Sequence, residues 1–370
     1  LIPSLKLLIT ISVHMKTVFV GIGQAGGKLA DQLVEFDLER GYGSVQNAIA
    51  INSAKTDLQP LSIETLLIGQ SQVKGHGVGG DNELGAEIME ADLPEVQQKV
   101  GNRITTEAES IILTTGLGGG TGSGGTPVLA RRLSEIYEIP VYVLAILPST
   151  EESNLAQVNA GRSLKTITDT VDATIVIDND AWKSTGESLT DGYERINQQI
   201  AKRVGLLLAA GEVQNSVAES VVDSSEVINT LRTGGIAAIG YNEVQAADST
   251  EENINTVSTA TRSALFSGLS LTGDTTAESA LLVITGKPDR ISRKGVEKSR
   301  RWLEDETGSM QVRGGDFPTD SEQIGALVVL GGIQHSDRIE GFFARAEEAA
   351  AAPTETEDDD EKMFQNDELD

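Results

Sequence analysis

Short runs of apolar residues recur through the first half of the chain, and each run leads through a polar or glycine-rich turn into another element. Runs without strict alternation are typical of strands that are buried on both faces of a parallel sheet. The runs that we predict to be strands are, in chain order, 16–23, 47–53, 109–116, 140–148 and 173–180. Helical apolar spacing follows the first and third runs, at 24–36 and 126–138. Strands alternating with helices predict a parallel α/β sheet, whose ligands bind beyond the carboxyl ends of the strands.

One long helix is predicted over 188–211, because Ser188 can cap its start and Gly211 can end it. The second, smaller domain has a mixed α+β pattern. Its predicted strands are 236–241, 279–286, 309–315 and 324–332, and its predicted helices are 251–267, 292–306 and 336–352. A chain of 370 residues exceeds what one hydrophobic core usually serves, so two domains are expected. We divide the chain into an N-terminal extension at 1–14, a first domain at 15–187, the central helix at 188–211, a second domain at 212–352 and an acidic tail at 353–370.

Acidic residues outnumber basic ones by 56 to 29, which gives a net charge of −27. A chain this negative is not expected to bind nucleic acid or an anionic membrane through its surface. The excess indicates either added solubility with an acidic tail or adaptation to very high salt, and the acid outside the tail favours adaptation to salt. We expect the tail to be disordered. The chain has three histidines and no cysteine, so disulfides and thiolate metal sites are excluded and no metal site is predicted.

Residues 1–14 are apolar, but they are too short to cross a bilayer and lack the basic start and cleavage site of a signal peptide. We interpret them as an extension upstream of Met15. No other apolar run is long enough for a membrane helix, so we expect a cytoplasmic protein without a transmembrane segment.

Three glycine-rich segments follow predicted strands of the first domain, at 21–28, 74–82 and 115–125. Glycine lets backbone N–H groups approach phosphate oxygens, and a helix N-terminus adds a favourable dipole. Three such segments at one sheet edge favour a polyphosphate, although the second alone could be a flexible surface loop. A Rossmann dehydrogenase would need an acid at the end of the second strand, where Asn52 stands. A P-loop NTPase would need a different pattern around Lys28, so neither alternative fits.

The segment GGGTGSG at 118–124 resembles the signature of the tubulin/FtsZ superfamily of GTP-binding, filament-forming proteins. The order of the other motifs is similar over most of residues 15–350, with a tubulin-like first loop and an FtsZ-like third loop. The resemblance implies a parallel-sheet GTP-binding domain, a long central helix and a smaller C-terminal α+β domain that activates hydrolysis. The loop residues that it assigns to the nucleotide are Gly23, Gln24, Ala25, Gly26, Asn52, Gly79, Gly80, Gly118, Gly119, Gly120, Thr121, Gly122 and Ser123.

Tyr193 and Asn197 are four residues apart at the start of the predicted long helix, so they share one helix face. A ring there can stack on a purine while the amide reads its edge, and Asn179 after the fifth strand can supply a second amide. The resemblance implies that Asn179 and Asn197 select guanine and that Glu152 contacts the ribose. For Tyr193 alone, packing against the sheet is the alternative. An arginine of FtsZ near the ribose contact is Ala156 here.

The segment 219–240 aligns without gaps to the catalytic loop and following helix of FtsZ, and Asp223 and Glu226 fall on its two acids. In that family the acids of one subunit act on the nucleotide of the next. Two carboxylates three residues apart at a helix start can face one direction and orient water for attack on a γ-phosphate. Taken alone, the pair is more readily a capping aspartate and a first-turn glutamate. An asparagine usual in FtsZ is Val221 here.

The mixture of tubulin-like and FtsZ-like loops resembles the CetZ group of haloarchaea. This resemblance implies an assembly-dependent GTPase that binds GTP or GDP, with Mg²⁺ held through the phosphates and water. It also implies that the protein polymerises with itself head to tail and acts in cell shape and motility, and the acidic tail is a candidate site for adaptor proteins. Two alternatives remain open: an FtsZ-type division GTPase and a non-hydrolysing, GTP-gated scaffold.

Overall fold

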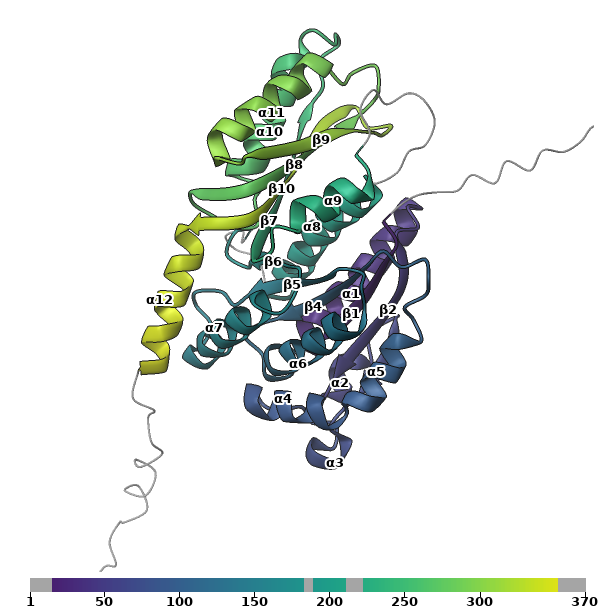
Figure 1. The fold of residues 1–370 in the computed structure, drawn as a ribbon, viewed down its shortest axis with the longest axis vertical. Helices are drawn as coiled ribbons and strands as arrows, with labels where there is room; N and C mark the ends of the chain where they lie inside the picture. The colour runs from purple at the N-terminus through teal and green to yellow at the C-terminus, as the bar shows by residue number, and fades with distance from the viewer. Residues whose placement is uncertain (1–14, 183–188, 211–221, 352–370) are drawn as a thin grey trace, which may run out of the picture.

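The structure, a computed structural model, describes residues 15–182, 189–210 and 222–351 (Figure 1). The extension at 1–14 and the acidic tail at 353–370 therefore lie outside the described residues. The strands of the first half are β1 (Thr17–Ile22), β2 (Val45–Asn52), β3 (Glu64–Leu67), β4 (Ser110–Gly116), β5 (Val141–Leu147) and β6 (Ala173–Asp178). They pair in parallel in the order β3-β2-β1-β4-β5-β6. Every residue of β1, β5 and β6 is buried, and the predicted parallel α/β sheet is confirmed.

Helices cover both faces of this sheet. The long helices of the first half are α1 (Gly23–Arg40), α6 (Gly120–Ile136) and α7 (Asn154–Thr168). Buried apolar side chains form one cluster on each face: α1 belongs to one, and α6 and α7 belong to the other. Each long helix begins just beyond the carboxyl end of a strand, so the helix N-termini gather at one edge of the sheet.

The region between β2 and β4 contains more regular structure than the sequence predicts. It holds the short helices α2 (Lys55–Leu58) and α3 (Gln70–Val73) and the longer helices α4 (Asn82–Ala91) and α5 (Leu93–Gly101), besides β3. Asp81 caps α4, since its side chain accepts a hydrogen bond from the Leu84 N–H at 3.0 Å. These elements were missed because each is too short to show a clear apolar period.

The long central helix α8 (Leu189–Ala209) lies where the sequence predicts it, although Ser188 and Gly211 fall outside the described residues. Its apolar face is buried through Ile196, Ile200 and Val204. Because α8 packs against α1 on one side and β7 (Ile236–Gln245) on the other, it connects the two halves of the molecule.

The second half extends the same sheet. Its other elements are α9 (Ser224–Leu231), α10 (Asn253–Phe266), β8 (Thr275–Gly286), α11 (Arg293–Thr307), β9 (Gln311–Pro318), β10 (Gln323–Ser336) and α12 (Asp337–Ala351). β7 pairs in parallel with β6, and the order continues as β7-β10-β8-β9, with β10 antiparallel to both neighbours. A mixed sheet with helices α10 and α11 confirms the predicted α+β class of this half.

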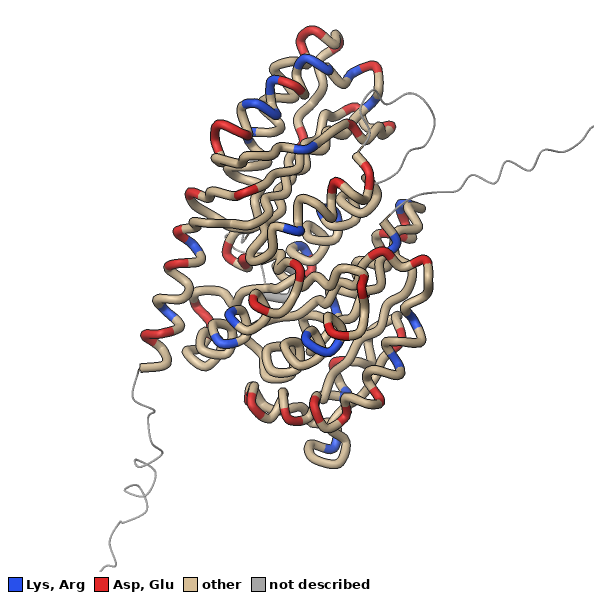
Figure 2. The backbone as a smooth tube through the Cα atoms, in the orientation of Figure 1, with Lys and Arg blue, Asp and Glu red and all other residues tan. Residues whose placement is uncertain are grey.

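The last helix, α12, returns to the first half and lies along α7 (Figure 1). A Cβ atom at Gly161 of α7 would lie only 2.7 Å from Cβ of Ala346 on α12, so the two helices are in close contact. Figure 2 shows acidic residues on both halves of the described chain, so they are not confined to the tail.

Candidate functional site

A cavity of about 510 Å³ opens at the carboxyl ends of β1, β2, β4, β5 and β6, beside the start of α8. All the nucleotide-binding residues predicted from the sequence line this cavity, apart from Gly26 and Ser123. The predicted residues that line it are Gly23, Gln24, Ala25, Asn52, Gly79, Gly80, Gly118, Gly119, Gly120, Thr121, Gly122, Glu152, Asn179, Tyr193 and Asn197. Motifs that lie far apart in the sequence therefore meet at one concave site of a size that suits a small ligand.

The glycine run supplies one wall of the cavity and the beginning of α6. Gly119 precedes the helix, and Gly120, Thr121 and Gly122 form its first turn. Backbone N–H groups in a first turn have no acceptor within the helix, and the helix dipole makes that end positive. These groups can therefore bind the oxygens of a phosphate. The hydroxyl oxygens of Thr121 and Ser53 share a hydrogen bond at 2.7 Å, which ties the run to the end of β2.

Several glycines at this wall also allow helix packing. A Cβ atom at Gly124 would lie 2.0 Å from the Asn82 carbonyl oxygen, and one at Gly120 would lie 2.7 Å from that of Asp81. A Cβ atom at Gly85 of α4 would lie 2.3 Å from the Gly120 carbonyl oxygen. Helices α4 and α6 thus pack backbone against backbone, which any side chain at these positions would prevent. This close helix contact is one physical cause of the glycine run.

The two predicted residues outside the cavity lie buried beside it. A Cβ atom at Gly26 would lie 2.0 Å from the Thr114 carbonyl oxygen, and the Thr114 hydroxyl donates to the Gly26 carbonyl oxygen at 2.8 Å. The Ser123 hydroxyl donates to the carbonyl oxygen of Gly119. In the structure Gly26 lets α1 approach β4, and Ser123 closes the first turn of α6.

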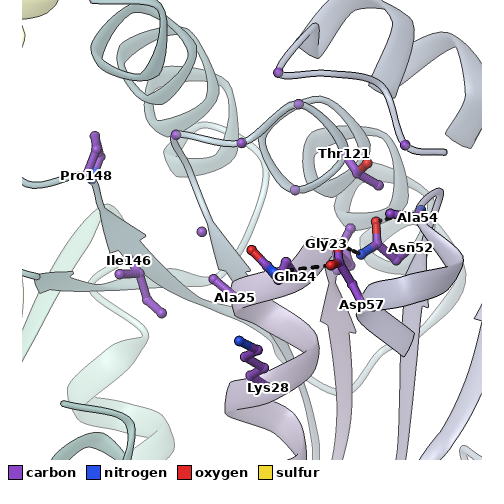
Figure 3. Close-up of a pocket in the computed structure, with 18 of the residues that line it drawn as sticks. Gly23, Gln24, Ala25, Lys28, Asn52, Ala54, Asp57, Thr121, Ile146 and Pro148 are labelled. Carbon is purple, nitrogen blue, oxygen red and sulfur yellow. Dashed lines mark hydrogen bonds between the residues drawn. The ribbon is translucent and has the colours of Figure 1, made fainter. Parts of the chain in front are cut away.

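Asp57 organises the amide side chains that face the cavity. Figure 3 shows the Gln24 and Asn52 side chains converging on the Asp57 carboxylate. The Gln24 amide donates to Oδ1 at 3.1 Å, and the Asn52 amide donates to Oδ2 at 3.0 Å. The carboxylate fixes both amides in one orientation, and the Asn52 Oδ1 in turn accepts hydrogen bonds from the N–H groups of Ser53 at 2.8 Å and Ala54 at 3.3 Å.

The loop before α4 is held by a buried asparagine of α7. Gly79 and Gly80 have φ angles of 60° and 87°, a backbone conformation that favours glycine. The Asn159 amide donates to the Gly80 carbonyl oxygen at 2.7 Å and to that of Gly118 at 3.2 Å. One side chain therefore joins this loop to the glycine run.

The groups predicted to recognise a base and a sugar line the cavity where it borders β5, β6 and the start of α8. Tyr193 and Asn197 lie on the same face of α8, and Tyr193 is 45% exposed, so its ring is not simply packed against the sheet. Asn179 follows β6 and is buried. Glu152 lies in the loop after β5, where its carboxylate accepts a hydrogen bond from the Ser149 N–H at 2.8 Å.

Some lining residues were not assigned from the sequence: Ile22, Lys28, Ala54, Asp57, His76, Gly77, Val78, Gly116, Ile146, Leu147 and Pro148. Ile146 and Pro148 lie on the side of the cavity away from Asn52 and Asp57 (Figure 3) and add apolar surface to its lining. Lys28 of α1 adds a positive charge to the lining of the cavity. Lys28 and His76 stand within the glycine-rich segments, which was a usable signal, whereas no pattern marked Asp57 as the partner of two amides.

Asp223 and Glu226 lie elsewhere in the chain. Neither lines the cavity; they stand at the start of α9, which packs against β8, β9 and β10 of the second half. Asp223 caps α9, because its carboxylate accepts a hydrogen bond from the Glu226 N–H at 3.0 Å. Glu226 is half-buried, and its Oε2 is buried without a hydrogen-bond partner. Burial, followed by the charge of Asp223, raises the pKa of the Glu226 carboxyl group. Val221 lies outside the described residues.

Within the described residues, no three histidine, aspartate or glutamate side chains gather closely enough to hold a metal ion. No helix of that same part of the chain has the length and hydrophobicity needed to span a membrane.

A parallel sheet with a glycine-walled cavity at its carboxyl edge, a central helix and a C-terminal α+β half defines the tubulin/FtsZ class of GTPase fold. Residues 16–187 match the GTPase domain of the Tubulin/FtsZ family. Residues 186–348 match the C-terminal domain of tubulin-like CetZ.

Individual relatives agree with these matches. The chain is 58% identical to tubulin-like protein CetZ2 of Haloferax volcanii over 357 residues, which are 96% of this chain and 99% of that protein. The structure of that CetZ2 as a GTPγS-bound protofilament is similar with a TM-score of 0.87, over 91% of this chain and 98% of the other. The GDP-bound monomer of CetZ1 from the same organism is 45% identical, with a TM-score of 0.83, over 91% of this chain and 100% of the other. The chain belongs to the CetZ family of tubulin-like proteins.

Proposed function

We propose that this protein binds and hydrolyses GTP and that its subunits stack head to tail into protofilaments, with α9 of one subunit completing the active site of the next. The observation that carries the proposal is the separation of two sets of residues within one chain. The nucleotide residues line a cavity in the first half, whereas Asp223 and Glu226 stand on α9 in the second half. The relatives support it, since CetZ2 has been solved as a GTPγS-bound protofilament and CetZ1 as a GDP-bound monomer.

Binding uses groups that are already oriented. The first N–H groups of α6 bind the phosphate oxygens, and the positive end of the helix dipole favours their charge. Where the cavity borders β6 and the start of α8, the Tyr193 ring stacks on the base while the amides of Asn179 and Asn197 read its edge. Glu152 accepts a hydrogen bond from the ribose. These roles give the site selectivity for guanine over adenine.

Hydrolysis requires a group that orients water at the γ-phosphate, and Glu226 of the neighbouring subunit supplies it. Burial raises the pKa of its carboxyl group, so the carboxylate accepts a proton more readily than an ordinary glutamate. Asp223 caps the helix and sets where Glu226 stands. The chemistry is therefore positioning and electrostatic stabilisation, as in other phosphoryl transfers.

Mg²⁺ fits this site as an ion held mainly through phosphates and water. Mg²⁺ commonly takes only one or two carboxylates from a protein. Asp57 and Glu152 are the carboxylates among the lining residues. When bound, the ion neutralises part of the phosphate charge.

The assembly-dependent GTPase differs measurably from a GTP-gated scaffold that does not hydrolyse. Phosphate release per subunit should rise steeply with protein concentration and approach zero in dilute, monomeric protein. A constant rate per subunit would place the whole active site in one chain, and no release at any concentration would favour the scaffold.

We further propose a role in cell shape and motility. Fluorescence imaging separates this role from FtsZ-type division by whether the protein gathers at division sites or in cells that change shape.

A further inference from the structure

Arg338, in the first turn of α12, forms a buried ion pair with Asp178 at the end of β6. The guanidinium Nε lies 2.5 Å from Oδ2 of Asp178, and Nη2 lies 2.7 Å from Oδ1. The exposed fractions of the two side chains are 9% and 1%, so both charges have lost most of their water. A two-pronged pair of this kind fixes the plane and the position of the carboxylate.

The carboxylate that Arg338 holds is next to a residue of the cavity. Asp178 directly precedes Asn179, which lines the cavity, and Asp178 Oδ1 also accepts a hydrogen bond from the Asp180 N–H at 3.1 Å. Fixing the side chain of Asp178 therefore fixes the turn that carries Asn179. The orientation of the Asn179 amide depends on that turn.

A second branch of contacts leads from Arg338 to the loop after β5. Arg338 Nη2 lies 3.7 Å from Oδ2 of Asp180. The Asp180 carboxylate accepts hydrogen bonds from the Ser149 hydroxyl at 2.7 Å and from the Thr150 N–H at 2.8 Å. This is the same loop in which the Ser149 N–H donates to Glu152, another lining residue. Contacts of Arg338 thus reach both the predicted base contact and the predicted ribose contact.

The ion pair is not the main attachment of β6 to the second half. The Asp178 N–H donates to the Ser270 carbonyl oxygen at 2.9 Å, and the Ser270 hydroxyl donates to the Val176 carbonyl oxygen at 2.7 Å. These hydrogen bonds already hold the strand. Arg338 adds control of the carboxylates of residues 178 and 180, and those carboxylates border the cavity-lining residues.

We propose that Arg338 is a positioning residue for the nucleotide site, through which the C-terminal helix α12 sets the affinity and selectivity for the guanosine part of the ligand. The inference rests on the proposed function, in that the cavity takes GTP. Coupling of this kind is reciprocal. Binding of a nucleotide in the cavity therefore strengthens the contact between Arg338 and Asp178, and loss of that contact weakens nucleotide binding.

The test compares Arg338→Gln with Arg338→Lys and with Phe342→Leu in the full chain. Phe342 is fully buried one turn further along α12 and makes no hydrogen bond to the 178–180 turn, so its variant is the control for loss of helix packing. Calorimetry measures the Kd for GTPγS and for ATP, and thermal unfolding measures the Tm of each variant. Hydrogen exchange of the nucleotide-free proteins measures local order in 148–152, in 178–180 and in the glycine run.

We expect Arg338→Gln to raise the Kd for GTPγS by about tenfold, which is within the usual range of coupling between sites. The weak binding of ATP should not change. Exchange should rise in 148–152 and 178–180 but not in 118–123. Arg338→Lys should recover part of the affinity, since it restores the charge but not the two-pronged contact. Phe342→Leu should lower the Tm and leave the Kd for GTPγS unchanged.

Arg338→Gln leaves the Asp178 carboxylate buried without its partner, which can prevent folding. The double variant Arg338→Gln with Asp178→Asn removes both charges, and it should fold and still bind GTPγS weakly. Wild-type affinity in Arg338→Gln or in the double variant would overturn the proposal, as would an equal loss in Phe342→Leu. Failure of the wild-type protein to bind GTPγS would instead overturn the proposed function.

Discussion

The cavity and the start of α9 differ in how completely a single chain builds them. Around the cavity, Asp57 orients two amides, Asn159 joins two loops, and the hydroxyls of Ser53 and Thr121 bond to each other. On α9, Glu226 has a buried oxygen with no partner and a pKa raised by burial and by Asp223. Buried polar atoms are normally satisfied, and the Glu226 oxygen is one of several in the described residues that are not. Under the proposed function, binding is prepared within one chain, whereas hydrolysis takes a component from a second chain.

The largest effect that distinguishes the two regions is expected from Glu226→Ala. Hydrolysis should fall by about 10²–10⁴-fold, because water loses the carboxylate that orients it. The affinity for GTP should not change, since Glu226 does not line the cavity of its own chain. Steady-state phosphate release and calorimetry measure the two quantities. Glu252→Ala, an exposed acid at the start of α10, is the control and should alter neither. Loss of GTP affinity in Glu226→Ala would mean that Glu226 belongs to the nucleotide site of its own chain.

Replacing guanine by adenine should produce the next largest effect, and only on the cavity. Adenine leaves the Asn179 and Asn197 amides mispaired, at about 1–3 kcal/mol for each unsatisfied group. Competition between ATP and labelled GTP measures the difference. Asn197→Ala should lower GTP affinity and leave that of ATP unchanged. Equal competition by ATP would contradict base recognition by these amides.

A smaller change is expected from Asp57→Asn, which keeps the shape of the side chain but turns one acceptor into a donor. One of the two amide hydrogen bonds is lost, at about 1 kcal/mol, so the Kd for GTP should rise several-fold. Asp31→Asn is the matched control, because Asp31 accepts two backbone hydrogen bonds from residues 62 and 63 and does not line the cavity. An unchanged Kd in Asp57→Asn would show that the amides need no orienting partner.

The smallest effect concerns pH and the stability of α9. The pKa of Glu226 is raised in the folded chain, so its contribution to stability is present at low pH and is lost as the pH rises through that pKa. Glu226→Gln should therefore raise the Tm slightly at neutral pH and not at acid pH. Turnover by the wild-type protein should decline as the pH falls through the same raised pKa. A lower Tm for Glu226→Gln at neutral pH would mean that the carboxylate stabilises its own chain.

The sequence predicts best what is local. The buried strands β1, β4, β5 and β6 and the glycine run between β4 and α6 are each encoded by a short contiguous pattern, and the structure places them as expected. Asn179, Tyr193 and Asn197 could be brought together only because the motif order resembles that of a known superfamily. Their spacing alone would not have placed Asn179 beside α8.

What the sequence does not predict depends on contacts between distant residues. Asn159 reaches two loops, and Arg338 pairs with a strand end 160 residues earlier. Neither residue stands in a motif. The glycine run was recognised from the sequence, but one reason for it was not. Gly124 has to be glycine because the backbone of α4 packs against it, and the sequence of the run does not indicate that contact.

A complementation assay tests the shared active site most directly. One partner is Glu226→Ala, which keeps the cavity but lacks the carboxylate. The other is Gly119→Trp, which keeps Glu226 but fills the cavity. The backbone at Gly119 accepts a side chain, because its φ angle is −82° and no atom lies within 4 Å of a Cβ placed there. Each variant alone should release almost no phosphate from GTP. Mixed together, they should release it at a rate well above the sum of the two, because the carboxylate of one chain meets the nucleotide of the other. A mixture no more active than that sum would contradict a site shared between subunits.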